Sequence, residues 1–233
     1  MNHDDLLAEQ IRYYDLRAAE YEDLYHRRGP YDLGPEGNAR YRAEALVMEQ
    51  GLRNFNAIGN VLELACGTGL WTRFLVESAD RLTAVDAAPS MIDINRARYG
   101  AAHVTYLQED IFAWAPAEVE WFDAIVFGFF ISHIPPERFT RFWERLRGWL
   151  TPGGRVFFMD DVAGPGRPYS GDVVTDGPEF AHRRTLADGR RFTIVKRFFE
   201  PDELTGMLAQ LGWDAVVRTT GTEFLIGEAS PAM

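Results

Sequence analysis

The chain has 233 residues, a net charge of −11 and a hydrophobic fraction of 46%, which is the composition of one globular domain with a sizeable core. The acidic balance repels phosphate backbones and anionic lipid, so we expect neither nucleic acid nor a membrane as partner. The pairs Arg27–Arg28 and Arg183–Arg184 are most simply solvated side chains on turns, and the alternative is a local basic patch.

The single cysteine, Cys66, excludes an internal disulfide and fits a reducing cytoplasm. It lies in an apolar segment, which favours a small buried residue over a nucleophile. The first residues lack the basic and apolar regions of a signal peptide, and the most apolar window, 122–134, is too short to span a bilayer. We expect a cytoplasmic protein that is a monomer or a homodimer.

The first part of the chain predicts two helices that precede the main domain. Apolar and aromatic residues recur at near-helical spacing over 4–26, and a second helix is expected over 38–52 with Asn38 as its N-cap. We expect residues 1–58 to form a helical lid on a core of residues 59–233, the whole being one compact domain.

From residue 60 onward, short apolar runs alternate with helical patterns. This alternation predicts successive βαβ units, a parallel sheet covered on both faces, and a ligand crevice at the carboxyl ends of the strands. The expected strands cover residues 61–65, 81–86, 103–107, 122–127 and 155–160, and the expected helices cover 70–77, 90–99 and 137–150.

Beyond residue 160 the rhythm changes. Asp188–Gly189 lies between two strand-like runs, which predicts a β-hairpin inside a substrate-side insertion over 161–200. A helix that opens at Pro201 and two strands over 213–219 and 222–228 complete the chain, the last two as an antiparallel edge. The fold class is therefore α/β with a doubly wound sheet.

The segment from Val61 to Gly69 carries the strongest functional signal. It combines an apolar strand, a turn with Gly67 and Gly69, and the start of a helix. Glycines let a ligand approach the backbone closely, and a helix start offers free N–H groups. Dinucleotide-binding proteins use the same arrangement, but they need a third glycine where this chain has Thr72.

Three carboxylates accompany this turn. Glu63 lies inside the first strand, Asp86 ends the second and Asp110 follows the third. Such a set suits a ligand with hydroxyls, an exocyclic amine and an ammonium group better than one dominated by phosphates. The alternative is structural: Glu63 as a strand-end ion partner, and the two aspartates as turn residues.

Taken in order, these elements resemble the class I S-adenosylmethionine-dependent methyltransferases over residues 60–160, with 122–127 as the fourth strand and 150–155 as the turn into the fifth. The resemblance implies a Rossmann-like seven-stranded sheet of order 3-2-1-4-5-7-6 with an antiparallel last strand. It implies S-adenosyl-L-methionine as the cofactor, S-adenosyl-L-homocysteine as its product, and methyl transfer to an oxygen or nitrogen of a small-molecule metabolite.

The resemblance also implies which residues hold the cofactor. Asp86 would accept both ribose hydroxyls, and Asp110 would bind the adenine amine while the Ile111 N–H meets a ring nitrogen. Glu63 would support the glycine turn from beneath or reach the ammonium group through water. The whole expected set is Tyr14, Tyr21, Glu63, Ala65, Gly67, Gly69, Thr72, Asp86, Ala87, Met91, Asp110, Ile111, Phe127 and Phe129.

After the fourth strand the chain carries aromatic residues where methyltransferases of nucleic acid bases carry an Asn or Asp followed by Pro-Pro-Tyr or Pro-Pro-Phe. His133 follows and is the candidate catalytic base, since its unperturbed pKa lies near neutrality. The alternative is a histidine that caps a turn or contacts only the cofactor, because alignment in a water-poor pocket can supply much of the catalysis. The expected substrate-side residues are Tyr25, Tyr31, Phe130, Tyr169 and His182.

Two other functions stay open. An NAD(P)-dependent oxidoreductase would need the third glycine and a Tyr-x-x-x-Lys dyad, whereas the only lysine, Lys196, lacks that spacing. A protein of the same fold could also use the cofactor for a non-methylating reaction such as cyclisation, or for binding alone. No metal is expected, because the histidines show no close spacing with Cys or carboxylates.

Overall fold

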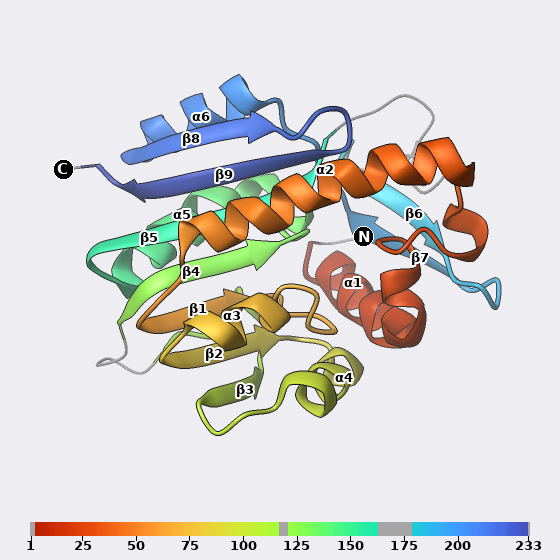
Figure 1. The fold of residues 1–233 in the computed structure, drawn as a ribbon, viewed down its shortest axis with the longest axis horizontal. Coiled ribbons are helices and arrows are strands. Elements are labelled where there is room, and N and C mark those ends of the chain that lie inside the picture. Colours follow the sequence, from red (N-terminus) through yellow and green to blue (C-terminus); the bar gives the residue numbers. More distant parts are fainter. Residues whose placement is uncertain (1–2, 117–120, 163–178, 233) are drawn as a thin grey trace.

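The computed structural model describes residues 3–116, 121–162 and 179–232. Its centre is a seven-stranded sheet in the order β3-β2-β1-β4-β5-β9-β8 (Figure 1). Because β9 and β8 are the seventh and sixth strands of the core, this is the predicted order. The strands are β1 Asn60–Leu64, β2 Arg81–Asp86, β3 Val104–Gln108, β4 Phe122–Gly128, β5 Leu150–Asp161, β8 Trp213–Thr219 and β9 Phe224–Pro231.

The first five strands run parallel, and β9 pairs antiparallel with both β5 and β8. The predicted fold class, an α/β Rossmann-like sheet with an antiparallel end, is confirmed. The helices are α1 His3–Arg17, α2 Gly34–Phe55, α3 Thr72–Ser78, α4 Pro89–Tyr99, α5 Pro136–Trp149 and α6 Pro201–Gln210, with 3-10 helices η1 Ala18–Asp23, η2 Gly29–Tyr31 and η3 Ile131–His133.

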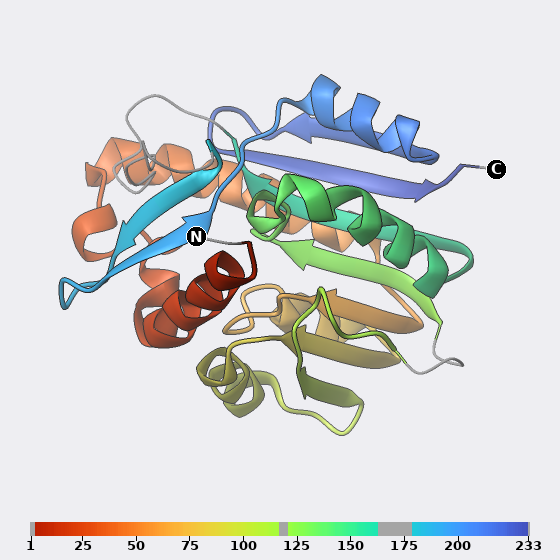
Figure 2. The same cartoon turned by 180° about the vertical axis from the view of Figure 1, so that it is seen from behind.

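Helices α2 and α5 cover opposite faces of the sheet, as a comparison of Figures 1 and 2 shows. Met48 of α2 packs with Phe157 of β5 in one apolar cluster. On the other face, Trp143 of α5 meets the rings of Phe127 and Phe158 edge-on. Burial on both faces explains why the central strands read as continuous apolar runs, and it fixes their carboxyl ends at one edge.

The N-terminal helices differ from the prediction. Helix α1 ends at Arg17, after which the chain continues as a 3-10 helix. Helix α2 begins at Gly34, so Asn38 lies inside it and the predicted N-cap is wrong; its amide oxygen accepts the Leu33 N–H at 3.0 Å. Pro35 sets this earlier start, because the fixed φ of proline suits the first helical turn.

The predicted hairpin is present as a separate two-stranded sheet, β6 Ala181–Thr185 and β7 Arg191–Val195. Gly189 in its turn has a φ of +87°, which glycine adopts readily. The hairpin lies beside α1 near the carboxyl ends of the parallel strands (Figure 1). Glu9 and Gln10 of α1 accept the N–H groups of Thr193 and Val195 at 2.8 and 2.9 Å, so helix and hairpin form one cover.

Candidate active site

Two neighbouring strands end in strained backbone. Ala65, which follows β1, and Phe129, which follows β4, have φ values of 52° and 57°, in the left-handed region that residues other than glycine seldom adopt. The two strands are paired, so the strained residues lie at the same edge of the sheet. Such strain gathers at ligand sites, and both residues line one cavity.

Asp86 fixes the glycine turn against the end of β2. Its two carboxylate oxygens accept the N–H groups of Gly67 and Ala88, each at 2.9 Å. Burial raises the pKa of this carboxyl group above its usual value. Each carboxylate oxygen has a second lone pair, so Asp86 can still accept hydrogen bonds from the hydroxyls of a ligand.

The turn, Asp86 and the start of α4 surround a first cavity, which we call the glycine-turn cavity. Helix α1 closes it from above with Gln10, Ile11 and Tyr14. Its lining is Gln10, Ile11, Tyr14, Tyr21, Ala65, Gly67, Asp86, Ala87, Ala88, Met91, Ile111, Gly128, Phe129, Phe130 and His133.

The structure therefore brings together most of the residues expected around the cofactor, and it leaves others outside the lining. Phe127 is fully buried and stacks on Phe158 in the core. Asp110 accepts the Phe112 N–H at 2.9 Å within its own turn. Gly69 faces the Tyr99 ring. No sequence signal pointed to Gln10, Ile11 or Ala88. These residues reach the cavity because α1 docks over it and because the chain turns after β2.

Glu63 and Thr72 lie beneath the glycine turn. The Thr72 hydroxyl donates to Glu63 at 2.6 Å and accepts from the Asn95 amide at 2.8 Å. The Asn95 amide also donates to the Gly67 carbonyl at 3.2 Å. Burial raises the pKa of Glu63 to about 8, so this side chain is protonated at neutral pH. Of the two roles expected for Glu63, the geometry favours support of the turn.

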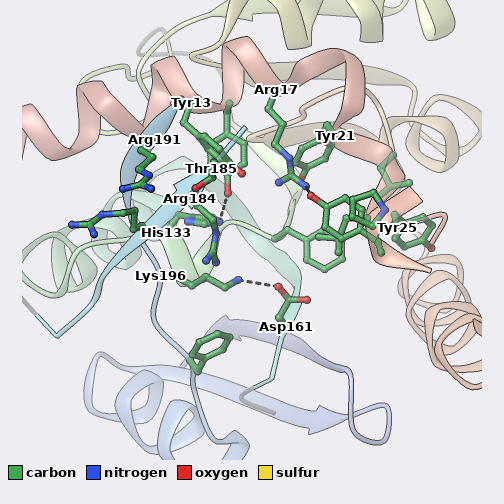
Figure 3. A pocket seen from close by; sticks show the side chains of 18 of the residues that line it. Tyr13, Arg17, Tyr21, Tyr25, His133, Asp161, Arg184, Thr185, Arg191 and Lys196 are labelled. Carbon is green, nitrogen blue, oxygen red and sulfur yellow. Dashed lines mark hydrogen bonds and ion pairs between the residues drawn. The ribbon is translucent and has the colours of Figure 1, made fainter. Parts of the chain in front are cut away.

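A second cavity of about 530 Å³ adjoins the first, and we call it the basic cavity (Figure 3). Cationic side chains reach it from α1 and from the hairpin, whereas Asp161 is the only carboxylate among the described residues that line it. The lining is Tyr13, Tyr14, Arg17, Tyr21, Leu24, Tyr25, Pro30, Tyr31, Tyr41, Leu70, Phe129, His133, Asp161, Arg183, Arg184, Thr185, Arg191, Lys196 and Phe198.

Lys196 anchors the hairpin to the end of β5. Its ammonium group contacts Asp160 and Asp161 at 3.2 and 2.9 Å and donates to the Ser132 hydroxyl at 2.9 Å. The lysine is 5% exposed. Burial lowers its pKa, but the two carboxylates outweigh burial and raise it, so Lys196 keeps its charge. Figure 3 shows this ammonium group facing Asp161, close to Arg184.

Among the described residues, neither Arg17 nor Arg184 forms a salt bridge with a carboxylate. Arg17 is 7% exposed, donates to the Tyr31 hydroxyl at 3.2 Å and lies over the Tyr21 ring. Nη1 of Arg184 is buried and has no hydrogen-bond partner in the described part of the chain. Because a buried donor without a partner is costly, this guanidinium suits an anionic ligand.

The two cavities share four lining residues, Tyr14, Tyr21, Phe129 and His133. These residues mark the passage between the cavities. Tyr14 and His133 are joined there by a hydrogen bond of 2.8 Å. The two cavities therefore meet at this set of aromatic side chains, which we call the junction.

His133 is held by two contacts. Its Nδ1 lies 2.5 Å from the Val195 carbonyl oxygen, which can only accept, so Nδ1 carries the proton. Nε2 is then the acceptor, and the Tyr14 hydroxyl donates to it. Burial, and next the charge of Lys196, hold the pKa of His133 well below its usual value. His133 is therefore neutral, and Tyr14 occupies its lone pair.

The expected substrate-side residues are divided. Tyr25 and Tyr31 line the basic cavity, and Phe130 lines the glycine-turn cavity. His182 is buried beside the Phe198 ring and lies outside both linings. Tyr169 falls outside the described residues.

The cations were missed by the sequence analysis. Arg183 and Arg184 belong to β6 and line the basic cavity, so the interpretation of Arg184 as a solvated turn residue is wrong. The sequence signal that could have revealed the cations was Lys196, the only lysine of an acidic chain, at the end of an apolar strand.

Within the described ranges, no group of His, Cys, Asp and Glu could hold a metal, and no helix is long and apolar enough to cross a membrane.

Comparison with known proteins places the chain among the methyltransferases. Residues 61–154 match a methyltransferase domain family. The solved structure of a DhpI-SAM-HEP complex is 38% identical, with a TM-score of 0.81, and the match covers 99% of this chain and 100% of that one. A DhpI-SAH complex is 37% identical, with a TM-score of 0.78, and the match covers 99% of both chains.

Curated relatives agree. A malonyl-[acyl-carrier protein] O-methyltransferase of Paenibacillus sp. (strain JDR-2) is 30% identical over 138 residues, which is 56% of this chain and 49% of that protein. Nodulation protein S of Rhizobium tropici is 31% identical over 105 residues, 43% of this chain and 42% of that protein. The chain spans about half the length of the curated relatives it matches, or less.

The lining of the glycine-turn cavity suits the cofactor named in the two DhpI complexes. Asp86 has lone pairs for ribose hydroxyls, Met91 and Ile111 offer apolar faces for a base, and the left-handed Gly67 keeps the turn open to a ligand. S-adenosyl-L-methionine is the cofactor. The glycine-turn cavity lies at the carboxyl ends of the strands, where doubly wound folds bind their ligands. The chain belongs to the class I S-adenosylmethionine-dependent methyltransferases.

Proposed function

We propose that this methyltransferase transfers the methyl group to an oxygen atom of a small molecule that is negatively charged at neutral pH. One observation carries the proposal: Arg17, Arg183, Arg184, Arg191 and Lys196 line the basic cavity, in a chain whose net charge is −11. Cationic side chains that are gathered in one cavity repel one another, and an anionic ligand offsets that repulsion.

The charge of the acceptor also accounts for the state of His133. S-adenosyl-L-methionine supplies the methyl group from its sulfonium. An ionised oxyacid already exposes a lone pair, so no residue has to remove a proton before transfer. His133 is neutral and its Nε2 already accepts the Tyr14 proton, so it is not free to act as a base. An ionised acceptor does not require one. An amine acceptor would be a cation at neutral pH, and the arginines of the cavity would repel it.

The size and walls of the basic cavity indicate the rest of the acceptor. Its volume of about 530 Å³ accommodates an organic group beyond the charged head. Tyr13, Tyr25, Tyr31 and Phe198 supply aromatic walls. We infer an organic oxyacid with a carbon skeleton, in place of a bare inorganic anion.

We further propose that α1 and η1, within the expected lid of residues 1–58, close the site after the cofactor binds. Asp15 accepts the Ser90 N–H at 2.8 Å, and Glu22 accepts from Thr68 at 2.7 Å, so both segments contact the loops around the glycine-turn cavity. Helix α2, in contrast, packs on the sheet. The described residues of the insertion expected over 161–200 would form the substrate side of the same enclosure.

A panel of acceptors tests the proposal. Small organic phosphates, phosphonates, sulfonates and carboxylates would be incubated with S-adenosyl-L-methionine, beside neutral alcohols and primary amines of the same carbon skeleton. The expected result is release of S-adenosyl-L-homocysteine, with a methyl ester as product, for at least one oxyacid and for none of the matched alcohols and amines. Turnover of amines in preference to oxyacids would overturn the proposal.

A further inference from the structure

The junction between the two cavities assigns a role to Tyr14. We propose that the Tyr14 hydroxyl oxygen positions the transferred methyl group, and that His133 acts through Tyr14 as a second positioning residue. The inference rests on the methyl-transfer activity of the family and is independent of the charge of the acceptor.

The direction of the hydrogen bonds is the first step. The Val195 carbonyl fixes the proton of His133 on Nδ1, which leaves Nε2 to accept the Tyr14 proton. The phenol has only one proton. Once that proton points at His133, the lone pairs of the Tyr14 oxygen are directed away from the imidazole.

The direction of the hydrogen bond from Tyr14 to His133 is also stable at neutral pH. Burial raises the pKa of Tyr14 well above its usual value, so the phenol remains a donor. Burial and Lys196 keep His133 neutral, so the imidazole remains an acceptor. Among the described residues, Arg17, Arg184 and Asp161 also act on the pair through their charges.

The third step is the place of the oxygen. Tyr14 lines both cavities, and the methyl group must pass between them. Helix α1 is fixed on both sides, by Gln10 to the Val195 N–H and by Asp15 to the Ser90 N–H. Methyl hydrogens next to a sulfonium are polarised, and C–H groups of that kind make weak hydrogen bonds to oxygen. Tyr14 thus supplies an oxygen at the junction of the two cavities, where such a contact would align the transfer.

Cofactor binding alone tests the role of Tyr14, without any acceptor. S-adenosyl-L-homocysteine lacks the methyl group and is the matched control ligand. We expect Tyr14→Phe to weaken S-adenosyl-L-methionine relative to S-adenosyl-L-homocysteine by about two- to fivefold in calorimetry. With [methyl-¹³C]-labelled cofactor, the methyl proton resonance of the bound state should lie downfield in the native protein and return upfield in Tyr14→Phe. An unchanged affinity ratio together with an unchanged resonance would overturn the assignment.

Two substitutions of His133 test whether it acts through Tyr14. The amide oxygen of His133→Gln can accept the Tyr14 proton, whereas His133→Leu cannot. We expect His133→Gln to keep the downfield resonance and His133→Leu to lose it. His103→Leu, far from the junction, is the control for the loss of a part-buried imidazole that contacts a carbonyl.

The combined variant completes the test. If Tyr14 and His133 act as one unit, Tyr14→Phe and His133→Leu together should shift the resonance no further than either change alone. Equal losses in His133→Gln and His133→Leu would overturn the role of His133. Melting temperatures measured on every variant distinguish a folding defect from a positioning defect.

Discussion

The two cavities of this enzyme are built in different ways. The glycine-turn cavity is made mainly from the ends of consecutive strands, with Gly67 after β1, Asp86 at the end of β2 and Ile111 after β3. The basic cavity is assembled from segments far apart in the chain, with Arg17 on α1 and Arg184 on the hairpin. The expected cofactor site thus follows a local pattern, whereas the proposed acceptor site depends on how the covering segments dock.

The largest effect is expected for Arg184→Ala. The change removes a buried guanidinium whose Nη1 has no partner in the described residues, so an anionic acceptor loses a charge-assisted hydrogen bond. We expect kcat/KM toward an oxyacid acceptor to fall by about 100-fold or more, which corresponds to about 3 kcal/mol, with the affinity for S-adenosyl-L-homocysteine unchanged. Steady-state kinetics and calorimetry measure the two quantities.

Arg190→Ala is the matched control for that variant. Arg190 belongs to the same hairpin, but it pairs with Asp188 in the turn and lies outside the basic cavity. It should retain native kcat/KM. A comparable loss in both variants would show that the hairpin arginines act through folding of the hairpin, and the two cavities would then not differ as described.

Asp86→Ala is expected to have an effect of about 1 to 3 kcal/mol on the other cavity. The change removes the acceptor for ribose hydroxyls and leaves the N–H groups of Gly67 and Ala88 without their partner. Affinity for S-adenosyl-L-homocysteine should fall about 5- to 150-fold in calorimetry. An unchanged affinity would mean that the ribose contact is misplaced.

Much of the first cavity could be predicted from sequence because its residues follow one another along the βαβ pattern. Asp86 and Gly67 are marked by their place at strand ends, and physical rules fix that place. Arg184 gave no such signal. In a lone hairpin, the side that faces a cavity depends on docking to α1 through Glu9 and Gln10, and these contacts span more than 180 residues.

Glu63 shows that, even in the βαβ segment, the sequence predicts the position of a residue better than its role. Its position near the turn was evident, but its role depends on burial: at 1% exposure it is a protonated partner of Thr72 and lies outside the cavity lining. A strand sequence does not report whether an acidic side chain points toward the ligand or toward the next helix, since one residue of register decides.

A smaller effect sharpens this distinction through pH. Glu63 has a pKa of about 8 in the folded protein and about 4.3 unfolded, so the folded state holds a proton that the unfolded state loses between these values. Stability from this group is complete below pH 4.3 or so and is lost as pH rises toward 8, at up to about 1.4 kcal/mol per pH unit.

Glu63→Gln cannot ionise and should lack that loss. Urea unfolding from pH 5 to 8 should show the native protein losing stability relative to Glu63→Gln as pH rises. Glu77→Gln, on an exposed side chain, is the control and should follow the native curve. Parallel curves for Glu63→Gln and the native protein would mean that Glu63 is ionised in the fold.

The most direct test measures the binding of two ligands, one for each cavity, in variants of each cavity. Calorimetry would measure S-adenosyl-L-homocysteine and, on the protein saturated with it, phenyl phosphate as an anionic probe, for the native protein, Asp86→Ala and Arg184→Ala. We expect Arg184→Ala to weaken binding of phenyl phosphate by about 100-fold or more and to leave the affinity for S-adenosyl-L-homocysteine unchanged. Asp86→Ala should weaken S-adenosyl-L-homocysteine instead. The difference between the two cavities would be contradicted if the native protein did not bind phenyl phosphate, or if Arg184→Ala bound it as tightly as the native protein does.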